Sequence, residues 1–182
     1  MQKYLEKISN PLVFVFAAAF IRLLPHAPNF APIGAMALFS GTYLDKKTAF
    51  LLPLGAMLLS DLFIGFDSLS SRLTVYGSFA LVALIGVWLR SHRSIGNVIL
   101  ASLSASVLFF IITNFGVWAF GTLYPKTIEG LVACFIAAVP FFRNTLAGDF
   151  FYTTVFFGGY EVIKILATDK KLAKIKIGVG ND

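Results

Sequence analysis

The chain consists of long apolar stretches separated by short breaks of proline or charged residues. Its mean hydropathy is +0.82, and 13% of its residues are charged against 58% that are apolar. Soluble globular domains keep about a quarter of their residues charged. A helix that crosses the roughly 30 Å hydrocarbon core of a bilayer needs about 20 apolar residues, or fewer where its ends lie in the interface. The sequence therefore predicts an all-α integral membrane protein with one domain over residues 1–182.

We expect six membrane-spanning helices and one shorter apolar helix. The spans are predicted at 11–24, 30–44, 48–66, 73–89, 95–120 and 144–162, followed by a cytoplasmic basic tail at 163–182. The remaining apolar stretch, 127–142, has 16 residues, which is roughly 24 Å of helix. Six spans place eleven Lys and Arg residues on the side of both termini and four on the other, whereas a seventh span would place seven and eight. Positive charge accumulates on the cytoplasmic side, so both termini are predicted there and 127–142 is interpreted as a re-entrant or interfacial helix.

Charge and cysteine content exclude several classes of protein. The net charge is +6, but the basic residues lie at the ends of apolar stretches instead of forming one basic face. This placement is typical of orientation signals in membrane proteins, and it predicts a lipid bilayer as partner and no nucleic acid. One cysteine cannot build a disulfide scaffold.

Polar and ionisable residues inside apolar spans are costly, so each one calls for a reason. Eight of them lie near the predicted outer ends of their spans or in the first outer turn, although they come from different parts of the chain: Arg22, His26, Asn29, Asp61, Asn114, Arg143, Asn144 and Asp149. Convergence of polar groups from several helices at one depth predicts a ligand cavity in the outer half of the bundle. The alternative is that Arg22 with Asp61, and Arg143 with Asp149, are ion pairs that fix the packing of the helices.

Aromatic residues flank the same region. Trp118 and Tyr152 are the candidates for stacking on a planar ligand, because such stacking needs rings beside a few directional hydrogen-bonding groups. The other aromatic residues there are typical of the belt at a membrane interface.

Motifs for catalysis and for cofactors are absent from the sequence. It has no nucleophile elbow, no zinc-protease motif and no glycine loop for phosphate. We therefore expect no enzyme activity, no cofactor and no metal. A weaker alternative is an intramembrane enzyme with His26 and Asp61 as acid and base, and weaker still is a soft-metal site that adds Cys134.

Four segments together resemble a family of small bacterial integral membrane proteins that are labelled transport proteins and whose biochemistry is uncharacterised. The segments are Arg22–Phe39, Ser60–Asp61, Thr113–Trp118 and Pro140–Asp149. The six-span layout is in turn similar to the substrate-binding S-components of energy-coupling-factor vitamin transporters. That resemblance implies a bacterial cytoplasmic membrane, a vitamin-like ligand bound near the outer face, and a transmembrane coupling subunit with ATPases as a partner. The S-components dock through an Ala-x-x-x-Ala pattern on the first span, where this chain has three consecutive alanines, Ala17–Ala19.

The expected function is the uptake of a small, vitamin-like or heterocyclic nutrient by a substrate-binding subunit or a solitary transporter. In this hypothesis Arg22 and Arg143 bind an anionic or carbonyl group, Asp61 and Asp149 hold the two guanidinium groups, and the asparagines provide hydrogen bonds. The alternative from another class is a membrane scaffold that organises envelope-building machinery and binds no small molecule.

Overall fold

The computed structural model describes residues 10–24, 27–66 and 68–178, and within 169–178 it describes the course of the helix without the side chains. The elements are α2 (Pro11–Ile21), α3 (Ile33–Tyr43), α4 (Lys46–Ile64), α5 (Leu69–Leu89), α6 (Ile95–Phe120), α7 (Ile128–Thr153), the π-helical turn η1 (Thr154–Gly158) and α8 (Gly159–Gly178). Because α7, η1 and α8 follow one another without a break, the described part of the chain has six helices, and it has no strand. The all-α prediction is confirmed.

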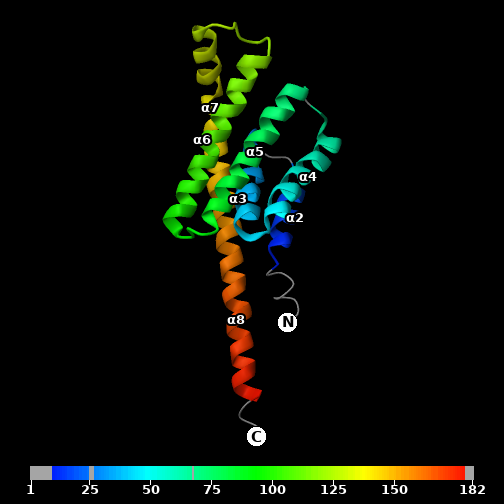
Figure 1. Ribbon diagram of the computed structural model, residues 1–182, viewed down its shortest axis with the longest axis vertical. Helices are drawn as coiled ribbons and strands as arrows, with labels where there is room; N and C mark the ends of the chain where they lie inside the picture. Colours follow the sequence, from blue (N-terminus) through cyan, green and yellow to red (C-terminus); the bar gives the residue numbers. More distant parts are fainter. Residues whose placement is uncertain (1–9, 25–26, 67, 179–182) are drawn as a thin grey trace.

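Successive helices run in opposite directions along the bundle (Figure 1). The start of α2, the α3–α4 and α5–α6 turns and α8 lie toward one end, which we call the terminal end. The α4–α5 and α6–α7 connections lie toward the opposite end, which we call the far end, and the α6–α7 hairpin extends furthest there. Side chains cap the helices at these turns: Asp45 accepts hydrogen bonds from the backbone N–H groups of Lys47 and Thr48, and Ser94 accepts one from Asn97.

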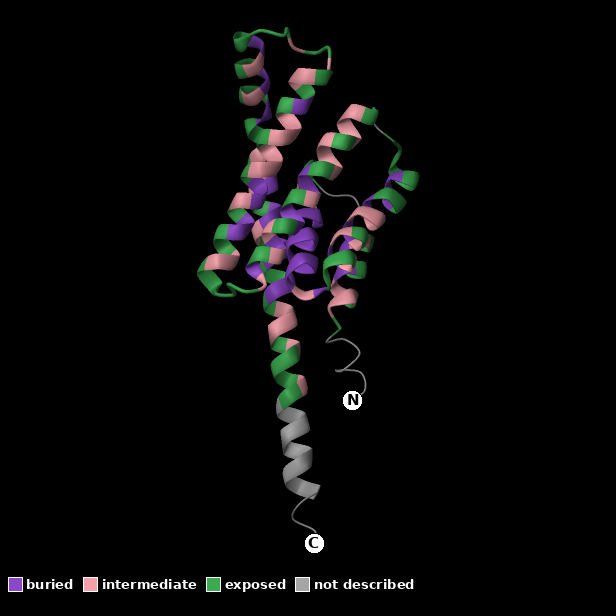
Figure 2. Ribbon diagram, viewed as in Figure 1, coloured by how far each residue is buried: buried purple, intermediate pink, exposed green. Residues whose placement is uncertain are grey.

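Helix α3 lies in the middle of the bundle. Ten of its 11 residues are buried, and it packs against α2, α4, α5, α6 and α7 (Figure 2). Its closest approach is to α5, where a Cβ atom at Gly41 or at Gly86 would overlap backbone atoms of the facing helix. The Thr42 hydroxyl also donates to the Gly86 carbonyl at 3.1 Å. At about 17 Å, α3 is shorter than the predicted span 30–44, and its neighbours enclose it.

The predicted boundary near residue 143 is wrong. Helix α7 continues through Arg143 and Asn144, so 127–142 is not a separate re-entrant or interfacial helix but the first part of a longer one. The exposed Arg143 side chain leaves the apolar packing of the helix uninterrupted. Pro140 lies inside α7, since a proline removes one N–H donor without necessarily ending a helix in an apolar bundle. The structure also continues the helix to Gly178, into the region predicted as a basic tail.

In the part of the chain that the structure describes, four helices are long and apolar enough to cross a membrane. They cover Lys46–Ile64, Leu69–Leu89, Ile95–Phe120 and the 41 residues Ile128–Thr168, while α2 is apolar but shorter. Large apolar side chains on these helices are exposed, including Phe63 at 81% and Ile95 at 83%. Exposed apolar surface of this extent is expected of helices that face lipid. The chain is therefore a multi-pass helical membrane protein.

Candidate functional site

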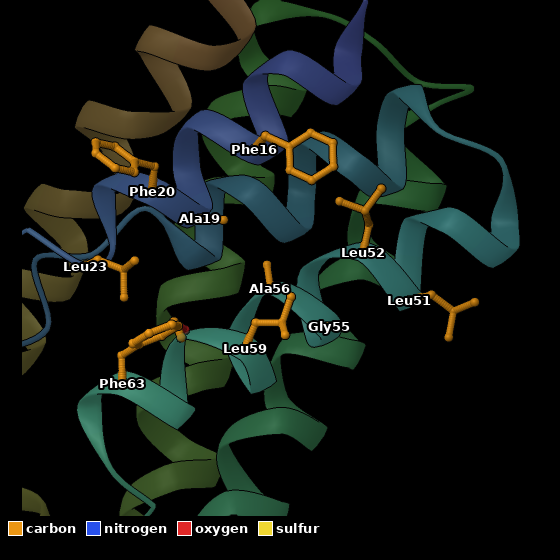
Figure 3. Close-up of a pocket in the computed structure, with 11 residues that line it drawn as sticks. Phe16, Ala19, Phe20, Leu23, Leu51, Leu52, Gly55, Ala56, Leu59 and Phe63 are labelled. Carbon is orange, nitrogen blue, oxygen red and sulfur yellow. The ribbon is translucent and has the colours of Figure 1, made fainter.

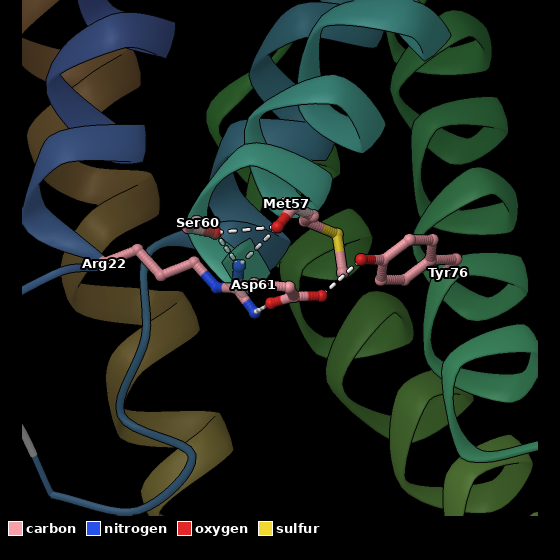
Figure 4. A network of polar contacts seen from close by, with 5 residues as sticks. All are labelled: Arg22, Met57, Ser60, Asp61 and Tyr76. Carbon is pink, nitrogen blue, oxygen red and sulfur yellow. Dashed lines mark hydrogen bonds and ion pairs between the residues drawn. The ribbon is translucent and has the colours of Figure 1, made fainter. Parts of the chain in front are cut away.

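An ion pair joins the end of α2 to the last turns of α4 (Figure 4). Arg22 directly follows α2, and its Nη2 lies 2.7 Å from Oδ1 of Asp61. Its Nη1 donates to the Met57 carbonyl at 3.0 Å and to the Ser60 hydroxyl. From α5, the Tyr76 hydroxyl donates to Oδ2 of the same aspartate. The two charged side chains are 14% and 11% exposed, so this mostly buried network links α2, α4 and α5.

A second carboxylate lies deeper in the bundle, on α7. Asp149 is 5% exposed, and the Ser106 hydroxyl of α6 donates to its Oδ2 at 2.6 Å. The carboxylate packs against Gly34 in the first turn of α3, where a Cβ atom would overlap it. Within the described residues the ion pairs are Arg22–Asp61 and Lys164–Glu161. Asp149 therefore has no cationic partner among the residues that the structure describes.

A cavity of about 320 Å³, which we call the central cavity, extends between Arg22 and Asp149. It is lined by Arg22, Asn29, Ala31, Ile33, Gly34, Ile64, Val75, Phe79, Val82, Ala105, Phe109, Thr145 and Asp149. Asn29 and Ile64 are exposed whereas Asp149 is buried, so the cavity leads from the surface to the carboxylate. Its volume lies at the lower end of the range for small-molecule sites, roughly 300 to 1,000 Å³.

The two charged groups that line the central cavity differ in how many of their hydrogen-bonding positions are occupied. A guanidinium group has five N–H donors, and Arg22 makes three contacts with Met57, Ser60 and Asp61. An ionised carboxylate offers about four acceptor positions, and among the described residues Asp149 accepts one hydrogen bond. Because Asp61 neutralises Arg22, Asp149 is the cavity group whose charge, when it is ionised, has no counter-charge among the described residues.

Three of the predicted site residues line the central cavity, namely Arg22, Asn29 and Asp149, and Asp61 joins them through its ion pair. Asn29 has a φ of 62°, in the left-handed region that asparagine adopts more readily than most residues. Asn144 of α7 contacts the segment between α2 and α3 that contains Asn29, because its Nδ2 donates to the Pro28 carbonyl at 3.0 Å.

Two other predicted residues lie too far along α6 to line the central cavity. The Asn114 amide donates to the Phe110 carbonyl of its own helix at 2.7 Å. Trp118 lies in the α6–α7 hairpin, where its Nε1 donates to the Pro125 carbonyl at 3.0 Å. Each residue advances a helix by about 1.5 Å, so Trp118 is roughly 13 Å further along α6 than the cavity residue Phe109.

Two further predicted residues, Arg143 and Tyr152, are not among the described residues that line the cavity. Arg143 is exposed on α7, and it forms no ion pair with Asp149. Tyr152 is buried among aromatic rings, with its ring centroid 5.6 Å from that of Phe30. His26 lies outside the described residues.

The sequence analysis missed four residues of the site, two phenylalanines and two hydroxyl-bearing residues. Phe79 and Phe109 form an aromatic wall of the cavity, with ring centroids 4.9 Å apart and an angle of 31° between the rings. They are two of 20 phenylalanines, so composition does not distinguish them. Ser106 and Tyr76 are hydroxyl-bearing residues within apolar stretches, and weighing such residues as heavily as charged ones would have found them.

Two other hollows differ from the central cavity in their chemistry. A groove of about 410 Å³ between α2 and α4 is apolar apart from Ser60, and exposed side chains such as Phe16 and Phe63 line it (Figure 3). A hollow of about 840 Å³ near the terminal end includes Tyr43 and Glu161, which are joined by a hydrogen bond of 2.8 Å. Unlike the central cavity, neither is lined by a buried carboxylate that lacks a cationic partner among the described residues.

The arrangement offers little for metal binding. Within residues 10–24, 27–66 and 68–178, no three His, Cys, Asp or Glu side chains are grouped so that they could hold a metal ion. The Cys134 sulfur, the third ligand of the weakest sequence alternative, lies 3.5 Å from the Asn114 carbonyl on α6. Asp61, its second ligand, has its two oxygens bonded to Arg22 and Tyr76.

Comparison with known proteins places the chain in one family. Residues 2–172 match the family of unknown function DUF6580, and the chain belongs to that family. No match was found among curated proteins or among solved structures.

Proposed function

We propose that this member of the family binds a small nutrient in the central cavity and takes it up, either as the substrate-binding subunit of a larger transporter or as a solitary transporter. The observation that carries the proposal is the buried carboxylate of Asp149, without a cationic partner among the described residues, at the inner end of a cavity that leads from the surface. A buried charge without a partner costs several kcal/mol. A bound molecule that compensates this charge would offset that cost.

The proposed orientation places the protein in a bacterial cytoplasmic membrane with the terminal end toward the cytoplasm. Lys46, Lys47, Arg90 and Arg93 all lie in or beside the turns at that end, in keeping with the accumulation of positive charge on the cytoplasmic side. The central cavity is built from the ends of α2 and α4 that lie toward the far end, so it would open to the outside.

Energy for uptake has to come from elsewhere, because the sequence contains no phosphate-binding loop for ATP. A transmembrane coupling subunit with ATPases remains our proposal for the substrate-binding form of the hypothesis. An ion gradient would serve the solitary form.

The roles of the charged residues in this proposal differ from those expected from the sequence. Arg143 is exposed and lies outside the cavity lining, so it takes no part in binding. Arg22 positions the cavity wall through Asp61, and Asp149 becomes the principal binding group. The scaffold alternative is favoured by a different observation, which is that the charges of Arg22 and Asp61 are paired with each other inside the protein.

Native mass spectrometry of protein purified gently from its own membranes tests the proposal. We expect a discrete small-molecule adduct, smaller than a lipid, on the wild-type protein and its loss in Asp149→Asn. Glu129→Gln is the matched control, since it removes an exposed carboxylate from the same helix and should keep the adduct. Wild-type protein that stays empty after purification and after incubation with a cell extract would favour the scaffold.

A further inference from the structure

We infer that the molecule bound in the central cavity carries a cationic nitrogen, which lies between the Asp149 carboxylate and the rings of Phe79 and Phe109. This inference rests on the proposed function and specifies the chemical class of its substrate. It also differs from the expectation from the sequence, in which Arg22 and Arg143 bind an anionic or carbonyl group of the ligand.

The first argument is the charge of the cavity. A carboxylate that is 5% exposed needs a counter-charge or several hydrogen bonds to be stable when ionised. Arg22, the cation that lines the same cavity, has its charge neutralised by Asp61 at 2.7 Å. An anionic ligand would face Asp149 across a cavity in whose described lining the one arginine is already paired. A cationic ligand would instead complete a second ion pair.

The second argument is the hydrogen-bonding geometry. Ser106 donates to Oδ2 of Asp149, and among the described residues this is the one hydrogen bond to a carboxylate that offers about four acceptor positions. Oδ1 packs against Gly34 of α3, so the positions left for a ligand are the remaining ones on the cavity side. Thr145, one turn earlier on α7, lines the cavity and directs its own proton to the Phe141 carbonyl at 3.1 Å. Its hydroxyl oxygen therefore keeps its capacity to accept. Free acceptors at Asp149 and Thr145 match a ligand that presents N–H donors.

The third argument is the aromatic wall. Phe79 and Phe109 line the cavity with their ring centroids 4.9 Å apart. Cations are attracted to the faces of aromatic rings within about 6 Å of the centroid, most strongly where water is excluded. One carboxylate beside two phenyl rings is an environment that favours an organic cation over a neutral molecule of the same shape.

The size of the cavity bounds the ligand. A volume of about 320 Å³ corresponds to roughly ten water molecules at about 30 Å³ each. A protonated amine or heterocycle with one or two rings fits this space, and a phospholipid does not.

Three probes with one phenyl ring and different charge test the inference: benzylammonium, benzyl alcohol and benzoate. Their binding to the full-length protein in phosphatidylcholine nanodiscs is measured by equilibrium dialysis at pH 7, with empty nanodiscs as the blank. We expect benzylammonium to bind the wild-type protein at least tenfold more tightly than either other probe. Asp149→Asn should abolish this preference, and Glu129→Gln should keep it.

Each other outcome overturns the inference. Stronger binding of benzoate, equal binding of the three probes, or a preference for benzylammonium that survives Asp149→Asn would contradict it. Absence of saturable binding by all three probes would contradict it as well, and the adduct test above then decides independently whether the proposed function stands. Should Asp149→Asn lower the melting temperature strongly, Phe109→Leu replaces it and should reduce the preference for benzylammonium.

Discussion

The carboxylate of Asp149 occupies the space that a Cβ atom at Gly34 would fill. The absence of a side chain at Gly34 of α3 thus leaves space for the buried Asp149 carboxylate of α7. Gly34→Ala should push the carboxylate out of place, lower the stability by roughly 1 to 3 kcal/mol through overpacking and weaken benzylammonium binding. The measurement is the melting temperature together with probe dialysis. Gly55→Ala is the control, since no atom lies within 4 Å of a Cβ there, and it should leave both quantities unchanged or raise the melting temperature.

Arg22 and Asp61 should behave as one unit. Replacing either by alanine leaves the other charge mostly buried without its partner, which typically costs about 3 to 5 kcal/mol. The double variant should therefore lose clearly less stability than the sum of the two single variants. Denaturant unfolding of the four proteins measures this coupling.

An exposed ion pair gives a reference value for the coupling energy of Arg22 and Asp61. Lys164 and Glu161 lie 3.7 Å apart with side chains that are 53% and 45% exposed. Exposed pairs are typically coupled by about 0 to 1 kcal/mol. Equal coupling energies for the two pairs would contradict the burial of the Arg22 network.

The crossing of α3 and α5 should not tolerate a methyl group. A Cβ atom at Gly86 would overlap the Leu38 carbonyl of α3, whereas one at Gly77, nine residues earlier on α5, meets no atom within 4 Å. Gly86→Ala should lower the melting temperature markedly, and Gly77→Ala should leave it unchanged or raise it, because alanine favours a helix over glycine by about 1 kcal/mol. Similar melting temperatures for the two variants would show that the helices do not cross at this point.

Two aromatic residues of α6 should differ in their effect on binding. Phe109→Leu removes one ring of the cavity wall, so we expect weaker binding of benzylammonium. Trp118→Leu changes the far hairpin and should leave the affinity of that probe within twofold of the wild-type value. A larger effect at Trp118 would support the aromatic role that the sequence predicted for it.

Acid should weaken the start of α4 through Asp45. Hydrogen bonds from the Thr48 hydroxyl and from the N–H groups of Thr48 and Lys47 hold the pKa of Asp45 below its ordinary value of 3.8. A carboxyl whose folded-state pKa is lowered contributes stability above its unfolded pKa and loses it as the pH falls through the folded value.

Melting temperatures of the wild-type protein and of Asp45→Ala across this range measure the contribution. The difference between the two proteins should be constant from pH 7 to about pH 5 and should shrink below about pH 4. A constant difference down to pH 3 would mean that the charge of Asp45 contributes nothing to the cap.

Sequence patterns predicted the helical class of the fold because apolar length is a property of single stretches. The range 95–120 coincides with α6, which begins after the cap Ser94 and ends at a glycine. The continuity of α7 was missed because, in the sequence alone, the polar residues Arg143 and Asn144 indicate a break between two apolar stretches. In three dimensions Arg143 points to the surface and Asn144 contacts Pro28, so the helix passes through both.

Some residues of the candidate site could be predicted from the sequence and others could not. Arg22, Asn29 and Asp149 could be selected from the sequence, because charged and amide groups near the ends of apolar spans are unusual wherever they occur. The aromatic wall could not, since which phenylalanines face a cavity depends on how α5 and α6 pack. Trp118 was selected for its ring, but the length of α6 carries it beyond the cavity.

The burial of α3 has a consequence for the order in which the protein is made. Residues 33–43 leave the ribosome before α5, α6 and α7, which form much of their final surroundings. A helix of about 17 Å with Ser40 and Thr42 in its buried surface is a poor independent insertion unit, because it is shorter than the hydrocarbon core. Biogenesis therefore has to hold the first helices in an unfinished state until the chain has been synthesised through α7, so the protein matures in its membrane as a whole and not helix by helix.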